Sequence, residues 1–93
     1  MTVTYNCTLN FAECEMTAVD VDKLKAALDK EPYDYCIDDE GIEIFGEVDA
    51  IKYDTSAADV AKDIEWLLWK VAGIDADVNA REVIYDKYDL YDA

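Results

Sequence analysis

Apolar residues occupy every second position in the first eleven residues of the chain. The apolar positions are Val3, Tyr5, Cys7, Leu9 and Phe11, and threonines and asparagines stand between most of them. This period of two is typical of a β-strand with one face buried and one face in water. We therefore expect a half-buried strand at the amino end.

Two segments repeat their apolar residues at helical spacing. The first starts with Thr17 and Asp20, which have the spacing of a capping box, and it must end before Pro32. This pattern predicts a helix over residues 18–30. The second segment starts at Ser56 and ends at Gly73, and its apolar stripe consists of Ala57, Val60, Ala61, Ile64, Leu67, Leu68 and Val71. This pattern predicts a helix over residues 56–73 that buries the stripe.

The segment between these helices alternates again. Apolar residues at 33, 35 and 37 and at 42, 44 and 48 alternate with acidic or small ones, and Asp39, Glu40 and Gly41 provide the chemistry of a turn. We expect a β-hairpin here. From Ala80 onward, more apolar residues fall on one face of a helix than on either face of a strand, and Asn79 and Glu82 have the spacing of a capping pair. We expect a third helix over residues 79–91.

These elements predict a single α+β domain over residues 1–93. The predicted order is β-α-β-β-α-α, a three-stranded antiparallel sheet with two to three helices packed on one face. If the tail is a strand instead, the order becomes β-α-β-β-α-β, that of a ferredoxin-like fold. Hydrophobic residues form 53% of the chain, which is enough to predict a packed core rather than an acidic disordered segment.

Charge changes the picture of what the domain binds. Twenty-three acidic residues face eight basic ones, and the net charge is −15. Nucleic acids and anionic membranes are disfavoured as direct partners, because binding them relies on lysine and arginine. Basic proteins are favoured, since opposite charge speeds their association.

The acidic residues are concentrated rather than spread. Residues 32–55 hold eight acids against Lys52, whereas residues 20–31 and 56–73 carry −1 each. Adaptation to high salt would place acids on the helices as well, so we disfavour it. Glu43, Glu47 and Asp49 have the parity of one strand face, whose side chains recur about every 6.5–7 Å. With the turn acids they form a row that resembles a phosphate backbone in spacing and sign.

We select twelve candidate partner-binding residues from these patterns. They are Asp34, Asp38, Asp39, Glu40, Glu43, Glu47, Asp49, Asp54, Asp86, Asp89, Trp66 and Trp69. The two tail aspartates are interleaved with Tyr85 and Tyr91, a pattern that suits a basic groove with apolar walls.

In size, net charge, α+β pattern and clustered carboxylates, the chain resembles the small acidic DNA-mimic inhibitors of phages and mobile elements. This class includes anti-restriction and anti-CRISPR proteins. The resemblance implies a non-enzymatic inhibitor in the host cytoplasm. Its partner would be a basic nucleic-acid-binding protein, such as a host nuclease or defence complex, whose binding channel it blocks.

Trp66 and Trp69 lie off the apolar stripe of the second helix on a helical wheel. One interpretation is that the tail helix packs over them. The other is that they form a contact with a partner or a second copy, since tryptophan concentrates binding energy at interfaces. The second interpretation gives an alternative function, an acidic assembly module that forms a homodimer.

Other chemistry finds little support in the sequence. The chain has no histidine, three glycines and one arginine, Arg81, which disfavours histidine-based catalysis and phosphate clamps. We expect no enzyme activity, no cofactor and no metal, because the acids of residues 38–41 and 75–77 do not match a calcium loop. Three cysteines without metal-ligand spacing predict reduced thiols in the cytoplasm.

Overall fold

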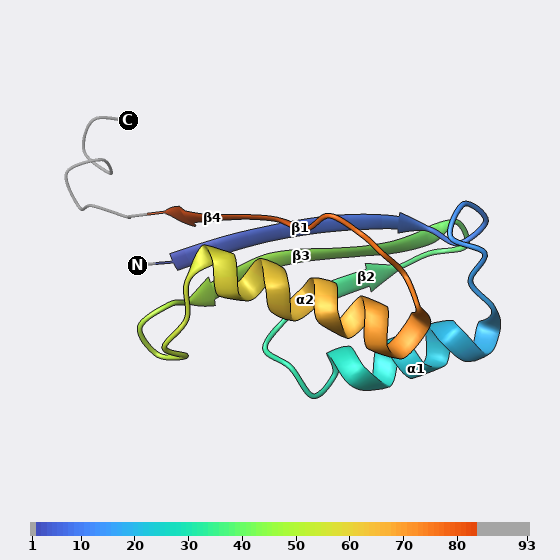
Figure 1. Cartoon of the computed structure of the whole chain (residues 1–93), viewed down its shortest axis with the longest axis horizontal. Coiled ribbons are helices and arrows are strands. Elements are labelled where there is room, and N and C mark those ends of the chain that lie inside the picture. The colour runs from blue at the N-terminus through green and yellow to red at the C-terminus, as the bar shows by residue number, and fades with distance from the viewer. Residues whose placement is uncertain (1, 84–93) are drawn as a thin grey trace.

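The computed structural model describes residues 2–83 as a four-stranded sheet and two helices (Figure 1). The elements are β1 (Thr2–Asn10), α1 (Ala18–Leu28), β2 (Tyr35–Ile37), β3 (Gly41–Asp49), α2 (Ala57–Ala72) and β4 (Asn79–Val83). The strand order across the sheet is β2-β3-β1-β4, and all three neighbouring pairs are antiparallel. The α+β class and the placement of the helices are confirmed, but the sheet has four strands where we predicted three.

The centre of the sheet is the long pair of β1 and β3. Nine residues of each strand pair, from Thr2 opposite Asp49 to Asn10 opposite Gly41. The alternation predicted for β1 is confirmed, because Val3, Tyr5, Cys7 and Leu9 are buried. The strand ends at Asn10, and Phe11 packs against the core from the turn that follows.

Local capping chemistry determines where the helices begin and end. Thr17 and Asp20 form both halves of the predicted capping box at the start of α1. The Ser56 side chain caps α2, and Gly73 ends α2 in the left-handed conformation with φ of 66°. The observed helices are shorter than predicted by two residues at the end of α1 and by one at each end of α2.

The prediction of a helix starting at residue 79 is wrong for residues 79–83. These residues form the edge strand β4, which pairs with β1 from Thr2 opposite Val83 to Asn6 opposite Asn79. The two positions paired with buried residues of β1 are Ala80, which is small and half-buried, and Glu82, which is acidic and exposed. The strand therefore carries no apolar alternation of its own. The remainder of the predicted helix, residues 84–91, lies outside the described residues. The element order β-α-β-β-α-β is that of the alternative prediction.

Both helices pack on the same face of the sheet (Figure 1). The core between the layers joins Leu24 and Leu28 of α1, the apolar stripe of α2, and the inward residues of β1 and β3. Among residues 2–83, every buried residue is apolar, cysteine or tyrosine. The opposite face of the sheet is therefore the surface on which the polar strand residues gather.

Candidate functional site

The face of the sheet that points away from the helices is the candidate site, and we call it the open face. It is formed by the strand residues that alternate with the buried ones. These are Thr2, Thr4, Asn6 and Thr8 of β1, Glu43, Phe45, Glu47 and Asp49 of β3, Cys36 of β2, and Asn79, Arg81 and Val83 of β4.

Strand β3 carries the acids of the open face. Glu43, Glu47 and Asp49 are exposed, and they alternate with the buried residues Ile42, Ile44 and Val48 in the manner that the sequence predicts. The strand places about 13 Å between Glu43 and Glu47 and about 6.5–7 Å between Glu47 and Asp49. Its neighbour β1 contributes neutral residues, so the negative charge forms a column along β3.

The turn between β2 and β3 extends this column with three more acids. Asp38, Asp39 and Glu40 are exposed. The Asp38 carboxylate accepts hydrogen bonds from the backbone N–H groups of Glu40 at 2.8 Å and Gly41 at 2.9 Å, a side-chain turn of the kind that aspartate favours. Asp38 thus stabilises the hairpin besides contributing charge.

A small hollow of about 160 Å³ lies at this end of the open face. Its charged lining residues are Asp38, Glu40 and Glu43, beside Thr8, Asn10 and Cys36. The three carboxylates come from the turn and from β3, Thr8 and Asn10 come from β1, and Cys36 comes from β2. Three of the described acids thus line one hollow at this end of the open face.

Asp49 also has a structural role. Its carboxylate accepts hydrogen bonds from the backbone N–H groups of Ile51 at 3.0 Å and Lys52 at 3.1 Å. The bond from Lys52 is the main cause that lowers the pKa of Asp49 below its usual value. Neutralising Asp49 would therefore disturb the turn after β3, so an Asp49 variant does not separate a loss of charge from a change in the fold.

The other acidic candidates are less well grouped. Asp34 is exposed just before β2, where its carbonyl oxygen accepts a hydrogen bond from the N–H of Phe45 at 3.2 Å. Asp54 is exposed in the loop after β3 and adopts a positive φ of 48°. Asp86 and Asp89 lie outside the described residues.

Two residues of the open face were not selected from the sequence. Phe45 is 46% exposed in the middle of the acidic column, between Glu43 and Glu47. Arg81 of β4 and Glu47 of β3 are both paired with Thr4, so they flank the same residue of β1. Phe45, Glu47 and Arg81 help to line a shallow depression of about 630 Å³. The alternation of β3 in the sequence already predicts that Phe45 lies on this face. Phe45 was not selected because the candidates on this strand were chosen for their charge.

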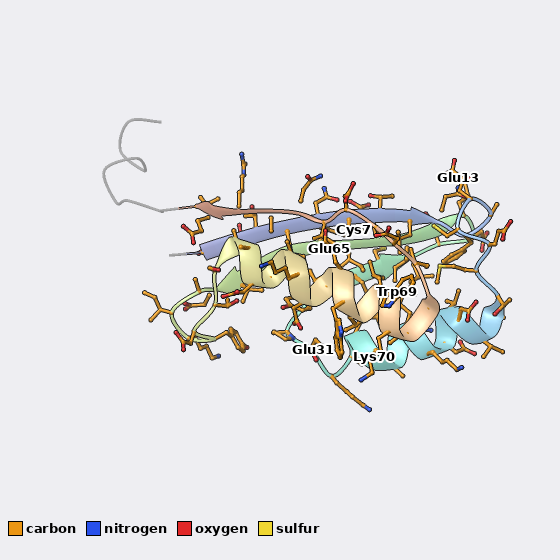
Figure 2. All side chains as sticks on the ribbon, in the orientation of Figure 1. Cys7, Glu13, Glu31, Glu65, Trp69 and Lys70 are labelled. Atoms are coloured by element: carbon orange, nitrogen blue, oxygen red, sulfur yellow. The ribbon has the colours of Figure 1, made fainter. Side chains whose placement is uncertain are left out.

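The tryptophan candidates lie in the helix layer, away from the open face. Trp66 and Trp69 are 58% and 62% exposed on α2, and Trp69 and Lys70 lie in its second half (Figure 2). The Lys70 ammonium lies 4.6 Å from the centre of the Trp66 ring. Most of the candidates therefore form two separate surfaces, one acidic and one aromatic. Asp34 and Asp54 belong to neither, and the two tail residues lie outside the described residues.

A metal centre has no support in the described part of the chain. Residues 2–83 contain no group of three histidine, cysteine or acidic side chains that could hold a metal ion. Cys7, Cys14 and Cys36 form no disulfide in the structure, and they are buried, half-buried and exposed, respectively. Burial raises the pKa of Cys7 to about 11, with smaller contributions from Cys14, Glu65 and Asp77. Neither described helix is long and apolar enough to cross a membrane.

Comparisons with known proteins leave the family open. No family model and no curated protein matches the chain. Among solved structures, the chain is similar to protein SP2199 from Streptococcus pneumoniae, with 12% sequence identity and a TM-score of 0.40 over 98% of this chain and 93% of that one. A similarity at this level carries no argument about function.

Proposed function

We propose that this chain is a non-enzymatic inhibitor that docks the open face into the basic, nucleic-acid-binding channel of another protein. One observation carries the proposal. The acids of β3 and of the β2–β3 turn line a sheet face from which both described helices are absent, because both pack on the other face. A surface with this charge is complementary to a channel lined with lysine and arginine.

The position of Phe45 supports the same function. Nucleic acid offers a basic channel both charged phosphates and flat rings, and proteins that bind single strands stack aromatic side chains on those rings. Phe45 places an exposed ring between Glu43 and Glu47. The open face thus presents alternating charge and aromatic surface along one strand.

The proposed partner is a nuclease or another protein of a host defence system, of the restriction or CRISPR type. Its basic channel would be occupied competitively, so the inhibitor needs neither a catalytic residue nor a metal. The chain would act in the cytoplasm of the host cell, where such partners bind nucleic acid.

Capture of partners from a host lysate tests this function. We expect immobilised wild-type chain to retain basic proteins that a salt gradient elutes, since exposed charge pairs are screened by salt. The double variant Glu43→Gln, Glu47→Gln should retain much less of them. The matched control Asp22→Asn, Glu31→Gln loses two exposed acids of the helix layer and keeps the same net charge as the double variant. Equal retention by the two variants would exclude the open face as the binding surface.

A further inference from the structure

The outward side of α2 carries a second surface, separate from the open face. We call it the outer stripe and define it as Asp59, Lys62, Trp66, Trp69 and Lys70, all of which are exposed. At 100° per residue these five side chains fall within about 60° on either side of Trp66. The outer stripe therefore presents two large aromatic rings to the surroundings.

The other two acids of α2 each accept a hydrogen bond from another part of the protein, although Asp63 is itself exposed. The Tyr33 hydroxyl donates a hydrogen bond to the Asp63 carboxylate at 2.8 Å. The Glu65 carboxylate accepts one from the backbone N–H of Val78 at 3.3 Å, and Figure 2 shows Glu65 beside Cys7 of β1. The outer stripe holds two lysines and Asp59, and the exposed Asp63 lies at its edge, about 60° from Trp66. This surface therefore carries little net charge, although the chain as a whole carries −15.

This arrangement is complementary to itself. Consider two α2 helices packed antiparallel across a two-fold axis that passes near residue 65. With a rise of 1.5 Å per residue, the positions of Lys70 and of the partner's Asp59 along the helix axis differ by less than about 2 Å. The axial positions of Lys62 and of the partner's Trp69 differ by the same amount. The two Trp66 rings lie about 3 Å apart along the same axis.

The angular positions of these side chains around the α2 axis also fit antiparallel pairing. Lys70 and Asp59 project to one side of Trp66, and Lys62 and Trp69 project to the other. In the antiparallel pair, each side of one helix faces the same side of the other. Lys70 then meets Asp59 of the second copy, and Lys62 meets Trp69 of the second copy. The interface contains two such ion pairs, two such cation–π contacts and one central pair of Trp66 rings. We propose that the outer stripe binds a second copy of this chain in this arrangement. The inference does not depend on the proposed inhibitory function.

The dimer is expected to be weak. Fully buried aromatic side chains contribute about 150–250 Å² each, so four partly buried tryptophans supply less than the roughly 1,200 Å² of a standard stable interface. Each copy also repels the other through its net charge of −15. Salt screens this long-range repulsion, so we expect dimerisation to strengthen as salt is raised. Binding of a basic partner to the open face should instead weaken as salt is raised. The opposite salt dependence distinguishes the dimer from the proposed inhibitory function.

Sedimentation equilibrium of the full chain tests the proposal. From about 10 µM to about 1 mM, a weak interface should shift the wild type from monomer toward dimer by mass action, and more so in about 0.5 M than in about 0.05 M NaCl. The variant Trp66→Ser, Trp69→Ser should remain monomeric. The control Ile51→Ser removes a 78% exposed side chain outside the outer stripe and should dimerise as the wild type does. A monomeric wild type at 1 mM in high salt, or a dimer that the tryptophan variant retains, would overturn the proposal.

A charge swap tests the two-fold geometry itself. Lys70→Asp places like charges opposite each other and should weaken the dimer at least about fivefold. Adding Asp59→Lys reverses both members of each ion pair and should restore most of the loss, because each new lysine faces a new aspartate. Circular dichroism confirms that each variant keeps its helices. A double variant no stronger than Lys70→Asp alone would exclude this arrangement, and dimerisation of Lys70→Asp at wild-type strength would do the same.

Discussion

The hydroxyl of Tyr33 donates a hydrogen bond of 2.8 Å to the carboxylate of Asp63. It connects the segment between α1 and β2 to α2, and the buried Tyr33 ring meets that of Tyr5 edge-on at 5.2 Å. Burial, followed by the bond to Asp63, raises the pKa of Tyr33 above its usual value. This contact ties the segment before β2 to α2 through Asp63, which is itself exposed.

Replacing Tyr33 by phenylalanine should destabilise the fold moderately. The ring stays in place, but the hydrogen bond to a charged acceptor is lost, which costs about 1–2 kcal/mol. Denaturant unfolding of Tyr33→Phe measures the loss. The control Tyr53→Phe alters a tyrosine that is 49% exposed and should change the free energy of unfolding by less than about 0.5 kcal/mol. Equal effects of the two variants would contradict the role given to Tyr33.

Gly46 of β3 should tolerate no side chain. Its φ is +157°, and an added Cβ would lie 2.7 Å from the hydroxyl oxygen of Tyr5. That oxygen already accepts a hydrogen bond from the N–H of Asp34 at 2.6 Å. We expect Gly46→Ala to cost about 2–3 kcal/mol, because both the backbone conformation and the tyrosine contact are strained.

Gly73→Ala provides the comparison for Gly46. Gly73 has a φ of +66°, but an added Cβ would meet no atom within 4 Å. Its substitution should cost only about 1 kcal/mol, the usual cost of a left-handed alanine. Thermal or denaturant unfolding ranks the two variants, and a Gly73→Ala variant less stable than Gly46→Ala would show that the Tyr5 contact is unimportant.

Buried Cys7 should make the fold sensitive to alkali. The folded pKa is raised from 9.0 to about 11, so the thiol contributes its full stability below pH 9. This contribution is lost as the pH rises from 9 through about 11, because the unfolded thiol ionises first. The total is about 2–3 kcal/mol. The measurement is the difference in unfolding free energy between wild type and Cys7→Ala from pH 8 to pH 11. Because both proteins contain the same tyrosines, this difference isolates the contribution of the Cys7 thiol.

A constant difference between wild type and Cys7→Ala over this pH range would contradict this role. The thiol of Cys7 would then ionise equally in the folded and the unfolded chain.

Neutralising Glu43 should not weaken the fold. Glu43→Gln relieves part of the self-repulsion of a chain that carries −15. We expect a free energy of unfolding equal to or up to about 1 kcal/mol above that of the wild type at low salt. Asp38→Asn should instead lower it by about 1 kcal/mol, because its carboxylate binds two backbone N–H groups of the hairpin. Urea unfolding of the three proteins distinguishes a binding role from a structural one.

Strong local patterns allowed much of the fold to be predicted. The alternation of β1, the stripe of α2 and the caps at Thr17, Ser56 and Gly73 all depend on neighbouring residues, and the structure confirms them. Strand β4 was missed because it is an edge strand whose two inward positions hold a small residue, Ala80, and an acid, Glu82. The preceding alternation of Ile74, Ala76, Val78 and Ala80 contained a signal, since the first and third of these are buried.

The candidate site was predictable in position but not in detail. Strand parity placed Glu43, Glu47 and Asp49 on one face, and the helical wheel placed Trp66 and Trp69 outside the core. The turn roles of Asp38 and Asp49 depend on backbone geometry. The pairing of β4 with β1, which brings Arg81 to the open face, is a long-range contact that no local pattern specifies.

Competition with DNA tests the central claim most directly. A basic protein captured by the chain is bound to a fluorescent DNA duplex, and wild-type chain is then added while the anisotropy is followed. A DNA mimic predicts full displacement of the duplex, weakened at least about tenfold in Glu43→Gln, Glu47→Gln and unchanged in the charge-matched Asp22→Asn, Glu31→Gln. A ternary complex in which the chain and the duplex bind the captured protein together would contradict the claim.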